Sequence, residues 1–159
     1  MAKIKVTARF AILELIDRFI DNATANDIGR TVVTEAKRMI AEGQSPVRGY
    51  GRFERYKDRT KYPGKLKDAR PVNLYLSGDM LKAFGHRISG KDAIEVGMVK
   101  GSELQNDKAT GHHTGDGYPV QRRFIPGEGE EFAVSIMRAI RDIYGKRLAS
   151  LIRKSNKKD

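Results

Sequence analysis

Two adjacent histidines, His112 and His113, are the side chains best suited to hold a metal ion, because Asp107 and Asp116 lie nearby in the sequence. Imidazole nitrogens and carboxylate oxygens are common zinc ligands. Adjacent side chains point to opposite sides of an extended chain, however, whereas paired histidine ligands usually stand four residues apart on a helix. We therefore expect solvated histidines in a loop over 110–117. A metalloenzyme or hydrolase that uses them stays a minor alternative.

A glycine-rich turn, Gly127-Glu128-Gly129, is followed by Glu130 and Glu131. It is a poor phosphate loop, because its glutamates would repel a phosphate and no Lys-Ser/Thr pair follows. Adjacent carboxylates also point in different directions, which makes a weak acid–base pair. Their best use is at the positive end of a helix dipole. We therefore expect neither an enzyme nor a bound cofactor or metal.

The composition favours an anionic neighbour. The chain has 159 residues, with 31 Lys and Arg against 20 Asp and Glu, a net charge of +11. Nucleic acid, a membrane surface or an acidic protein would suit this excess, and a basic protein with a solvated surface is the simpler alternative. No cysteine is present, which excludes disulfides and thiolate chemistry. We see no signal peptide and no apolar run of membrane-spanning length, so we expect synthesis in the cytoplasm and no membrane partner.

The first part of the chain, 1–43, has the pattern of a helical hairpin. Apolar residues predict one helix over Arg9–Asn22 and a second over Asp27–Glu42. Thr24 or Asn26 can cap the second helix, and Gly43 can end it.

The segment 72–126 has the pattern of a small sheet with short helices. We expect extended chain over 72–76, a brief helix over 80–84, and strands over 86–89 and 93–99. In the last of these strands the alternation predicts three inward side chains, Ile94, Val96 and Met98.

Three further segments complete the predicted fold. A short helix should cover 102–109, and a strand bracketed by prolines should cover Val120–Ile125 and add to the sheet. A long helix over 130–152 should follow, with a charged tail. These elements form a single domain over 1–159, with helices at both ends, the last within 127–159, and a small antiparallel sheet between them.

The segment 44–71 is different in kind, because it has no helical or strand period and interleaves cations with aromatic residues. Disordered segments are usually poor in aromatics, so we interpret it as an extended arm that becomes ordered against a partner. Tyr and Arg are enriched at interface hot spots. The residues proposed to contact a partner are Arg48, Tyr50, Arg52, Phe53, Arg55, Tyr56, Lys57, Arg59 and Tyr62.

Four segments follow one another along the chain: 76–84 (LSGDMLKAF), 94–97 (IEVG), His112 or His113 with Gly115 and Gly117, and 119–126 (PVQRRFIP). In this order they resemble the L-x-[ST]-G-x-L turn, the V-x-[VI]-G strand, the His and Gly loop and the P-x-R-x-F segment of the phage virion-morphogenesis proteins, the head–tail joining group. The positions that carry the likeness are Gly78, Leu81, Gly97, Pro119, Arg122, Arg123 and Phe124. The resemblance implies an α+β fold in which N-terminal helices and a long terminal helix pack on a small antiparallel sheet.

The resemblance implies a structural virion protein that forms a homo-oligomeric ring at the head–tail junction, around the DNA channel. Its role would be that of a neck, tail-completion or tail-terminator protein. The implied partners are the portal or connector and the tail tube or sheath proteins, with non-specific DNA contact in the channel. The implied location is the virion, after synthesis in the host cytoplasm.

Alternatives remain open for both the chain and the motif. The chain could instead be a non-specific nucleic-acid-binding protein that acts through the basic, aromatic arm. Within the motif, Arg122, Arg123 and Phe124 could anchor the segment against the helices or against a neighbour, or Phe124 could simply belong to the core.

Overall fold

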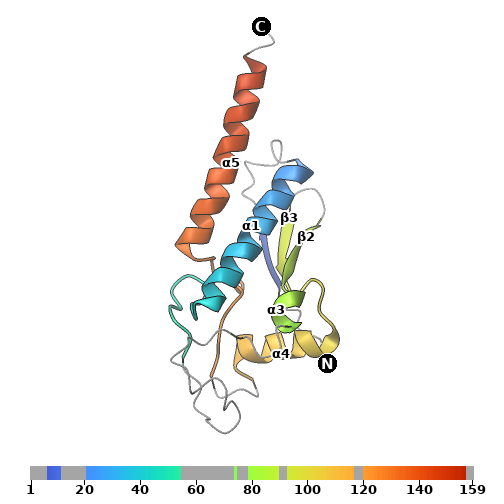
Figure 1. Ribbon diagram of the computed structural model, residues 1–159, viewed down its shortest axis with the longest axis vertical. Helices are drawn as coiled ribbons and strands as arrows, with labels where there is room; N and C mark the ends of the chain where they lie inside the picture. The colour runs from blue at the N-terminus through green and yellow to red at the C-terminus, as the bar shows by residue number, and fades with distance from the viewer. Residues whose placement is uncertain are drawn as a thin grey trace.

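The computed structural model describes residues 7–11, 21–54, 74, 79–89, 93–116 and 120–156, and over 7–11 only the backbone. The elements in chain order are β1 (Thr7–Ala11), α1 (Asn22–Ala41), α3 (Asp79–Ala83), β2 (Gly85–Ser89), β3 (Ala93–Gly97), α4 (Glu103–Thr114) and α5 (Val134–Ser155). The fold is α+β, as predicted, with α1 lying between the sheet and α5 (Figure 1).

The sheet has the order β1-β3-β2, and both pairs are antiparallel. Ile94 of β3 lies opposite Phe10 of β1 on one side and Ile88 of β2 on the other. The inward residues are as predicted, because Ile94 and Val96 of β3 and Met98 just after it are at most 1% exposed. The core therefore forms where β3 meets α1.

The helix predicted over Arg9–Asn22 is wrong at its start. Thr7–Ala11 is instead strand β1, which pairs with β3 from Thr7↔Gly97 to Ala11↔Ala93. A short apolar run does not by itself distinguish a strand from a buried helix. Here the strand forms because the edge of β3 has backbone amide and carbonyl groups that need hydrogen-bond partners. The segment 1–43 is therefore not a simple helical hairpin, and 12–20 lies outside the described residues.

Helix α1 forms because apolar residues recur every three or four positions on the face that meets the sheet. Asp21 caps it by accepting a hydrogen bond from the amide of Thr24 at 2.8 Å, so neither Thr24 nor Asn26 is the cap. Gly43, with a φ of 74°, follows its end as predicted. The buried apolar residues of α1 are Ala25, Ile28, Val32, Ala36, Met39 and Ile40.

Helix α5 begins at Val134, later than predicted, and it has no acidic residue in its first turn. The expectation that Glu130 and Glu131 cap it is therefore wrong. The helix runs antiparallel to α1, since Ser135 lies near Met39 and Arg147 binds Asp21 at 2.6 Å. It extends well past the sheet (Figure 1).

Helix α4 is longer than predicted, because it continues to Thr114. Its first turn is closed by Gln105, whose side chain accepts a hydrogen bond from the amide of Ser102 at 2.9 Å. Gly115, with a φ of 80°, ends it. His112 and His113 therefore lie in the last turn of a helix, which corrects the loop expected over 110–117.

The strand predicted over Val120–Ile125 does not form. The segment 120–131 has no regular secondary structure and does not join the sheet, where both edges of β3 are already occupied by β1 and β2. It runs beside the end of α4 and reaches Phe132, which makes an isolated antiparallel bridge to Val47. This segment, and not a strand, leads into α5.

Candidate functional site

Phe124 lies at the point where the separate motifs meet. Its side chain is fully buried, with ring centroids 6.3 Å from Phe84 and 6.4 Å from His113, both edge-on. Ile94 and Val96 of β3 belong to the same core cluster as Phe84 and Phe124. Phe124 therefore contacts residues from two other segments that carry the family resemblance, and the described part of the fourth segment lies in the same core.

The residues after Val120 are held against the end of α4 by hydrogen bonds to its last carbonyl groups. The amide of Arg122 donates to the carbonyl of His112 at 2.7 Å, and the side-chain amide of Gln121 donates to the carbonyl of His113 at 2.7 Å. A β-carbon at Gly115 would lie 3.2 Å from that of Gln121. The glycine after α4 therefore allows the two segments to approach closely.

The other described positions that carry the resemblance contribute to the packing of the fold. Arg122 is 3% exposed, and its guanidinium donates to the carbonyl of Glu54 at 3.2 Å. Gly97 ends β3 with a φ of 154°, which favours glycine, and Leu81 packs partly against the core. Gly78 and Pro119 lie outside the described residues. The alternative that Phe124 is a core residue is confirmed.

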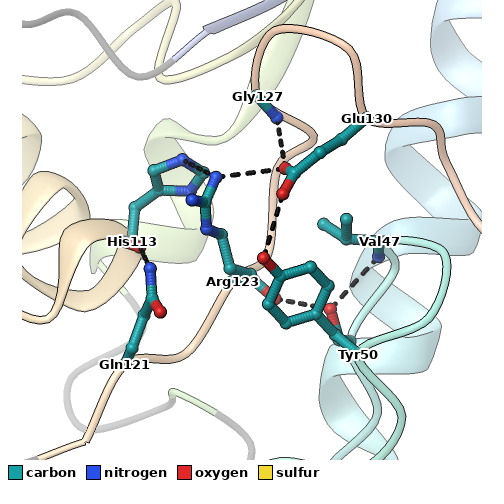
Figure 2. A network of polar contacts seen from close by, with 8 residues as sticks. Val47, Tyr50, His113, Gln121, Arg123, Gly127 and Glu130 are labelled. Atoms are coloured by element: carbon teal, nitrogen blue, oxygen red, sulfur yellow. Dashed lines mark hydrogen bonds and ion pairs between the residues drawn. The ribbon is translucent and has the colours of Figure 1, made fainter.

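Arg123 and Glu130 are the centre of a polar network that joins three segments (Figure 2). A terminal nitrogen of Arg123 lies 3.0 Å from Glu130 Oε2 and 3.0 Å from Nε2 of His113. Glu130 also accepts hydrogen bonds from the Gly127 amide at 2.7 Å and from the Tyr50 hydroxyl at 2.9 Å. The Arg123 guanidinium lies 5.7 Å from the centre of the Tyr50 ring.

The network shifts the pKa values of His113 and Glu130 in ways that fix their protonation at neutral pH. Burial lowers the pKa of His113, and the charge of Arg123 lowers it further against the opposing effect of Glu130. Burial alone would raise the pKa of Glu130. The Gly127 amide, the Tyr50 hydroxyl and Arg123 outweigh that effect and hold the pKa of Glu130 below its usual value. At neutral pH the neutral imidazole of His113 therefore accepts a hydrogen bond from Arg123, and the Glu130 carboxylate forms an ion pair with Arg123.

The first part of the predicted arm is fastened to its own chain. The Ser45 hydroxyl donates to the carbonyl of Arg123 at 2.6 Å, and the Ala133 amide donates to the carbonyl of Pro46 at 2.7 Å. The Arg48 amide donates to the carbonyl of Glu131 at 2.9 Å. The expectation that the whole arm takes shape only on a partner is therefore wrong for 44–54, because the segment 121–133 supplies the hydrogen-bond partners.

The residues within 44–54 that were proposed to contact a partner differ in how far their side chains already make contacts within the chain. Arg48 binds Glu131 at 2.5 Å, and Phe53 is partly buried against the core. Tyr50 is 45% exposed, although its hydroxyl binds Glu130. Arg52 is exposed and makes no ion pair with any described residue. Five further positions lie outside the described residues: Arg55, Tyr56, Lys57, Arg59 and Tyr62.

A groove of about 370 Å³ opens between this segment and the start of α5. Its apolar side is formed by Met39, Val47, Ala133 and Val134, and Arg48 and Arg52 stand at its polar side. Val134 is 56% exposed although it is a large apolar residue. The groove thus combines an apolar surface with cations.

Helix α5 carries the largest excess of positive charge in the described chain. It has six basic residues and one carboxylate, Asp142. Arg147 is bound to Asp21. The remaining cations are exposed and form no ion pair with a described residue: Arg138, Arg141, Lys146, Arg153 and Lys154.

The described residues contain no group of three His, Asp or Glu side chains placed to hold a metal ion. His112 and His113 are neighbours on one helix, and His113 is engaged by Arg123. In the same part of the chain no helix has the length and apolar character needed to cross a bilayer. His113, expected as a solvated loop histidine, instead contacts Arg123 and Phe124.

Comparisons with protein-family models, with curated proteins and with solved structures each found no match to this chain.

Sequence reasoning missed the roles of Tyr50 and Glu130. The two residues are eighty positions apart, and nothing local in the sequence shows that they meet. One signal was available, since Arg123 and Glu130 flank a turn with two glycines, a spacing that allows a side-chain pair to close across it. The groove had no sequence signal, because it is formed by segments far apart in the chain.

Proposed function

We propose that this chain is a structural virion protein of a tailed phage, which forms a ring at the head–tail junction around the DNA channel. The observation that supports this best is that Phe84 and His113, from two of the resembling segments, pack against Phe124 in a third. The fourth segment, 94–97, contributes Ile94 and Val96 to the same core.

Two other features support an assembly role. The net charge of +11 suits a position next to DNA or acidic proteins. At the groove, the exposed Val134 (56%) adjoins Met39, Val47 and Ala133 beside two arginines, and clustered apolar surface rimmed by polar residues is typical of sites that other proteins cover.

The decisive experiment is deletion of the gene in the phage or prophage that carries it, followed by electron microscopy of the lysate. The proposal expects filled heads and tails that remain separate, and joined particles when the gene is supplied in trans. Infectious particles of normal shape from the deletion strain would overturn it. An antibody against the full chain should label the junction in wild-type particles.

A second candidate function, non-specific nucleic-acid binding, is favoured by the five exposed cations of α5. Their attraction to phosphates would release counterions, so binding should weaken steeply with salt. A titration of duplex DNA with the purified chain at two salt concentrations tests it. Reversal of Arg141 and Lys146 to Glu should reduce binding, and absence of binding by the wild-type chain at low salt would eliminate this candidate.

A further inference from the structure

We infer that the groove beside α5 receives the start of α4 from a second copy of this chain, in a head-to-tail contact. The inference deepens the proposed ring, and it rests on that proposal for the closing of the contact into a ring. The occupant is a patch on α4 formed by Leu104 and Asp107, referred to below as the α4 patch. The receiving surface is the groove defined above by its apolar wall and its two arginines.

The α4 patch is an apolar side chain bordered by negative charge. Leu104 is 62% exposed, more than any other large apolar residue in the described part of the chain. Asp107 follows one turn later and Glu103 precedes it, so both carboxylates border the same side of Leu104 on the helix. Asp107 forms no ion pair with any described residue. Lys108 stands on the other side of Leu104.

The groove has the complementary character. Val134 supplies an exposed apolar wall above the buried Val47 and Met39. Arg52 is exposed and lacks an ionic partner in the described chain, while Arg48 is already bound to Glu131. An apolar side chain entering the groove would therefore bring its neighbouring carboxylate to Arg52.

The glycines of this loop keep the groove open. Gly49 and Gly51 have φ values of 87° and 65°, and a β-carbon at either position would meet no atom within 4 Å. The positive φ values let the chain turn between Arg48 and Arg52. The space beside these glycines is thus available to a side chain from outside.

The two surfaces lie on opposite sides of the molecule. In Figure 1 the yellow start of α4 lies at the right of the molecule and the teal segment that follows α1 lies at its left. One chain therefore cannot satisfy both surfaces by itself, whereas a row of copies can. A contact between two different surfaces of the same chain is heterologous, and such contacts close into rings when the rotation permits. Complementary charge also fixes the orientation of the neighbours.

The test uses charge reversal in the purified full chain, with sedimentation velocity over a range of concentrations. Arg52→Glu and Asp107→Arg should each weaken self-association about tenfold or more, because each places like charges together. The double variant Arg52→Glu/Asp107→Arg should associate like the wild type. An equal mixture of the two single variants should also associate, because each groove then faces an oppositely charged patch of the other variant.

Lys108→Glu is the matched control, since it reverses a charge one residue from Asp107 without creating like charges at Arg52. It should leave association unchanged or strengthened. The circular dichroism of all variants should match the wild type, because the altered residues are exposed. A wild-type chain that stays monomeric at every concentration, or single variants that associate normally, would overturn the inference. Failure of the double variant or of the mixture to restore association would do the same.

A second measurement uses the absence of cysteine from the chain. When Leu104→Cys and Val134→Cys chains are mixed and oxidised, a covalent dimer should form between one copy of each, because these side chains would share the groove. Ile152→Cys mixed with Leu104→Cys is the control and should cross-link far less. Equal cross-linking of the two mixtures would contradict the contact.

The interface and the proposed function can fail independently. If charge reversal blocks association but deletion of the gene leaves normal particles, the contact stands and the virion role falls. If deletion separates heads from tails but the charge variants associate normally, the role stands and this contact falls.

Discussion

Gly29 of α1 lies directly against the imidazole ring of His86 in β2. A β-carbon at position 29 would overlap Cδ2 and Cγ of that ring. His86 in turn reaches toward Asn26 of the same helix, with Nε2 3.4 Å from Oδ1. The missing side chain at position 29 therefore sets how closely α1 approaches the sheet.

Gly29→Ala tests this close approach. Alanine is favoured over glycine in a helix by about 1 kcal/mol, but forced overpacking costs about 1–3 kcal/mol, so we expect a net loss of stability. In a His86→Ala background the overlap with the ring disappears and only the 3.1 Å approach to the β-carbon of residue 86 remains, so the same change should cost less than in the wild type or stabilise by up to about 1 kcal/mol. Urea unfolding of the four chains measures both effects, and a stabilising Gly29→Ala in the wild-type background would contradict the packing.

Phe124 tests whether the resembling segment is core or surface. Because the ring is fully buried between Phe84 and His113, Phe124→Ala should lower the free energy of unfolding by about 3–5 kcal/mol. Phe124→Leu, which keeps most of the volume, should cost less than about 1.5 kcal/mol. Leu104→Ala, at an exposed apolar position, is the control and should change little. Equal, small effects of both Phe124 variants would show that this side chain does not hold the core.

His113 gives a pH dependence with a definite sign. Its pKa is lowered from 6.5 in the fold by burial and by Arg123, so the unfolded chain binds a proton more readily than the folded chain. The contribution of neutral His113 to the free energy of unfolding is fully present above pH 6.5. It is lost as the pH falls through 6.5 toward the pKa of His113 in the folded chain. Protonation would also place an N–H of the ring against the Arg123 donor.

His113→Gln should therefore flatten the fall in thermal midpoint when the pH is lowered from neutral to mildly acidic values. A residual slope is expected from His86, whose pKa is lowered by burial and by Arg30 and Lys100. Glu130 does not contribute to this slope, because its pKa in the folded chain lies below 4.5. The stability that its carboxylate provides is therefore lost only at lower pH. An unchanged pH profile in His113→Gln would refute the role of this imidazole.

The parts of the fold that local patterns determine could be predicted from the sequence. Alternation identified Ile94, Val96 and Met98 as inward, and Gly43 marked the end of α1. The strand β1 could not be distinguished from a helix, because its apolar residues suit either period and the edge of β3 makes the choice.

The extension of α4 was missed for a related reason. Its last turn contains Thr110, His112 and His113, which are poor helix formers, and contacts from Gln121 and Arg122 hold it. The polar network and the groove depend on residues distant in sequence, so only the assembled chain reveals them. The arm could be recognised as unusual, but its attachment over 44–54 requires hydrogen-bond partners that the sequence does not place nearby.

Glu130→Ala tests that attachment. One carboxylate accepts from the Gly127 amide, the Tyr50 hydroxyl and Arg123, so its removal leaves three donors without this acceptor. We expect a loss of about 1–3 kcal/mol in the free energy of unfolding, since Arg123 is largely buried and charged.

The more specific signature is local. Amide hydrogen exchange should accelerate over 45–53, while the amides in β3 should change less. Within 45–53 the amides of Ser45, Arg48 and Phe53 donate to the carbonyls of Gly51, Glu131 and Gly43. Tyr50→Phe removes one of the three donors and is the matched control, with a smaller acceleration in the same segment. If Glu130→Ala instead raised exchange equally in β3 and over 45–53, the carboxylate would act on global stability and not on the attachment of this segment.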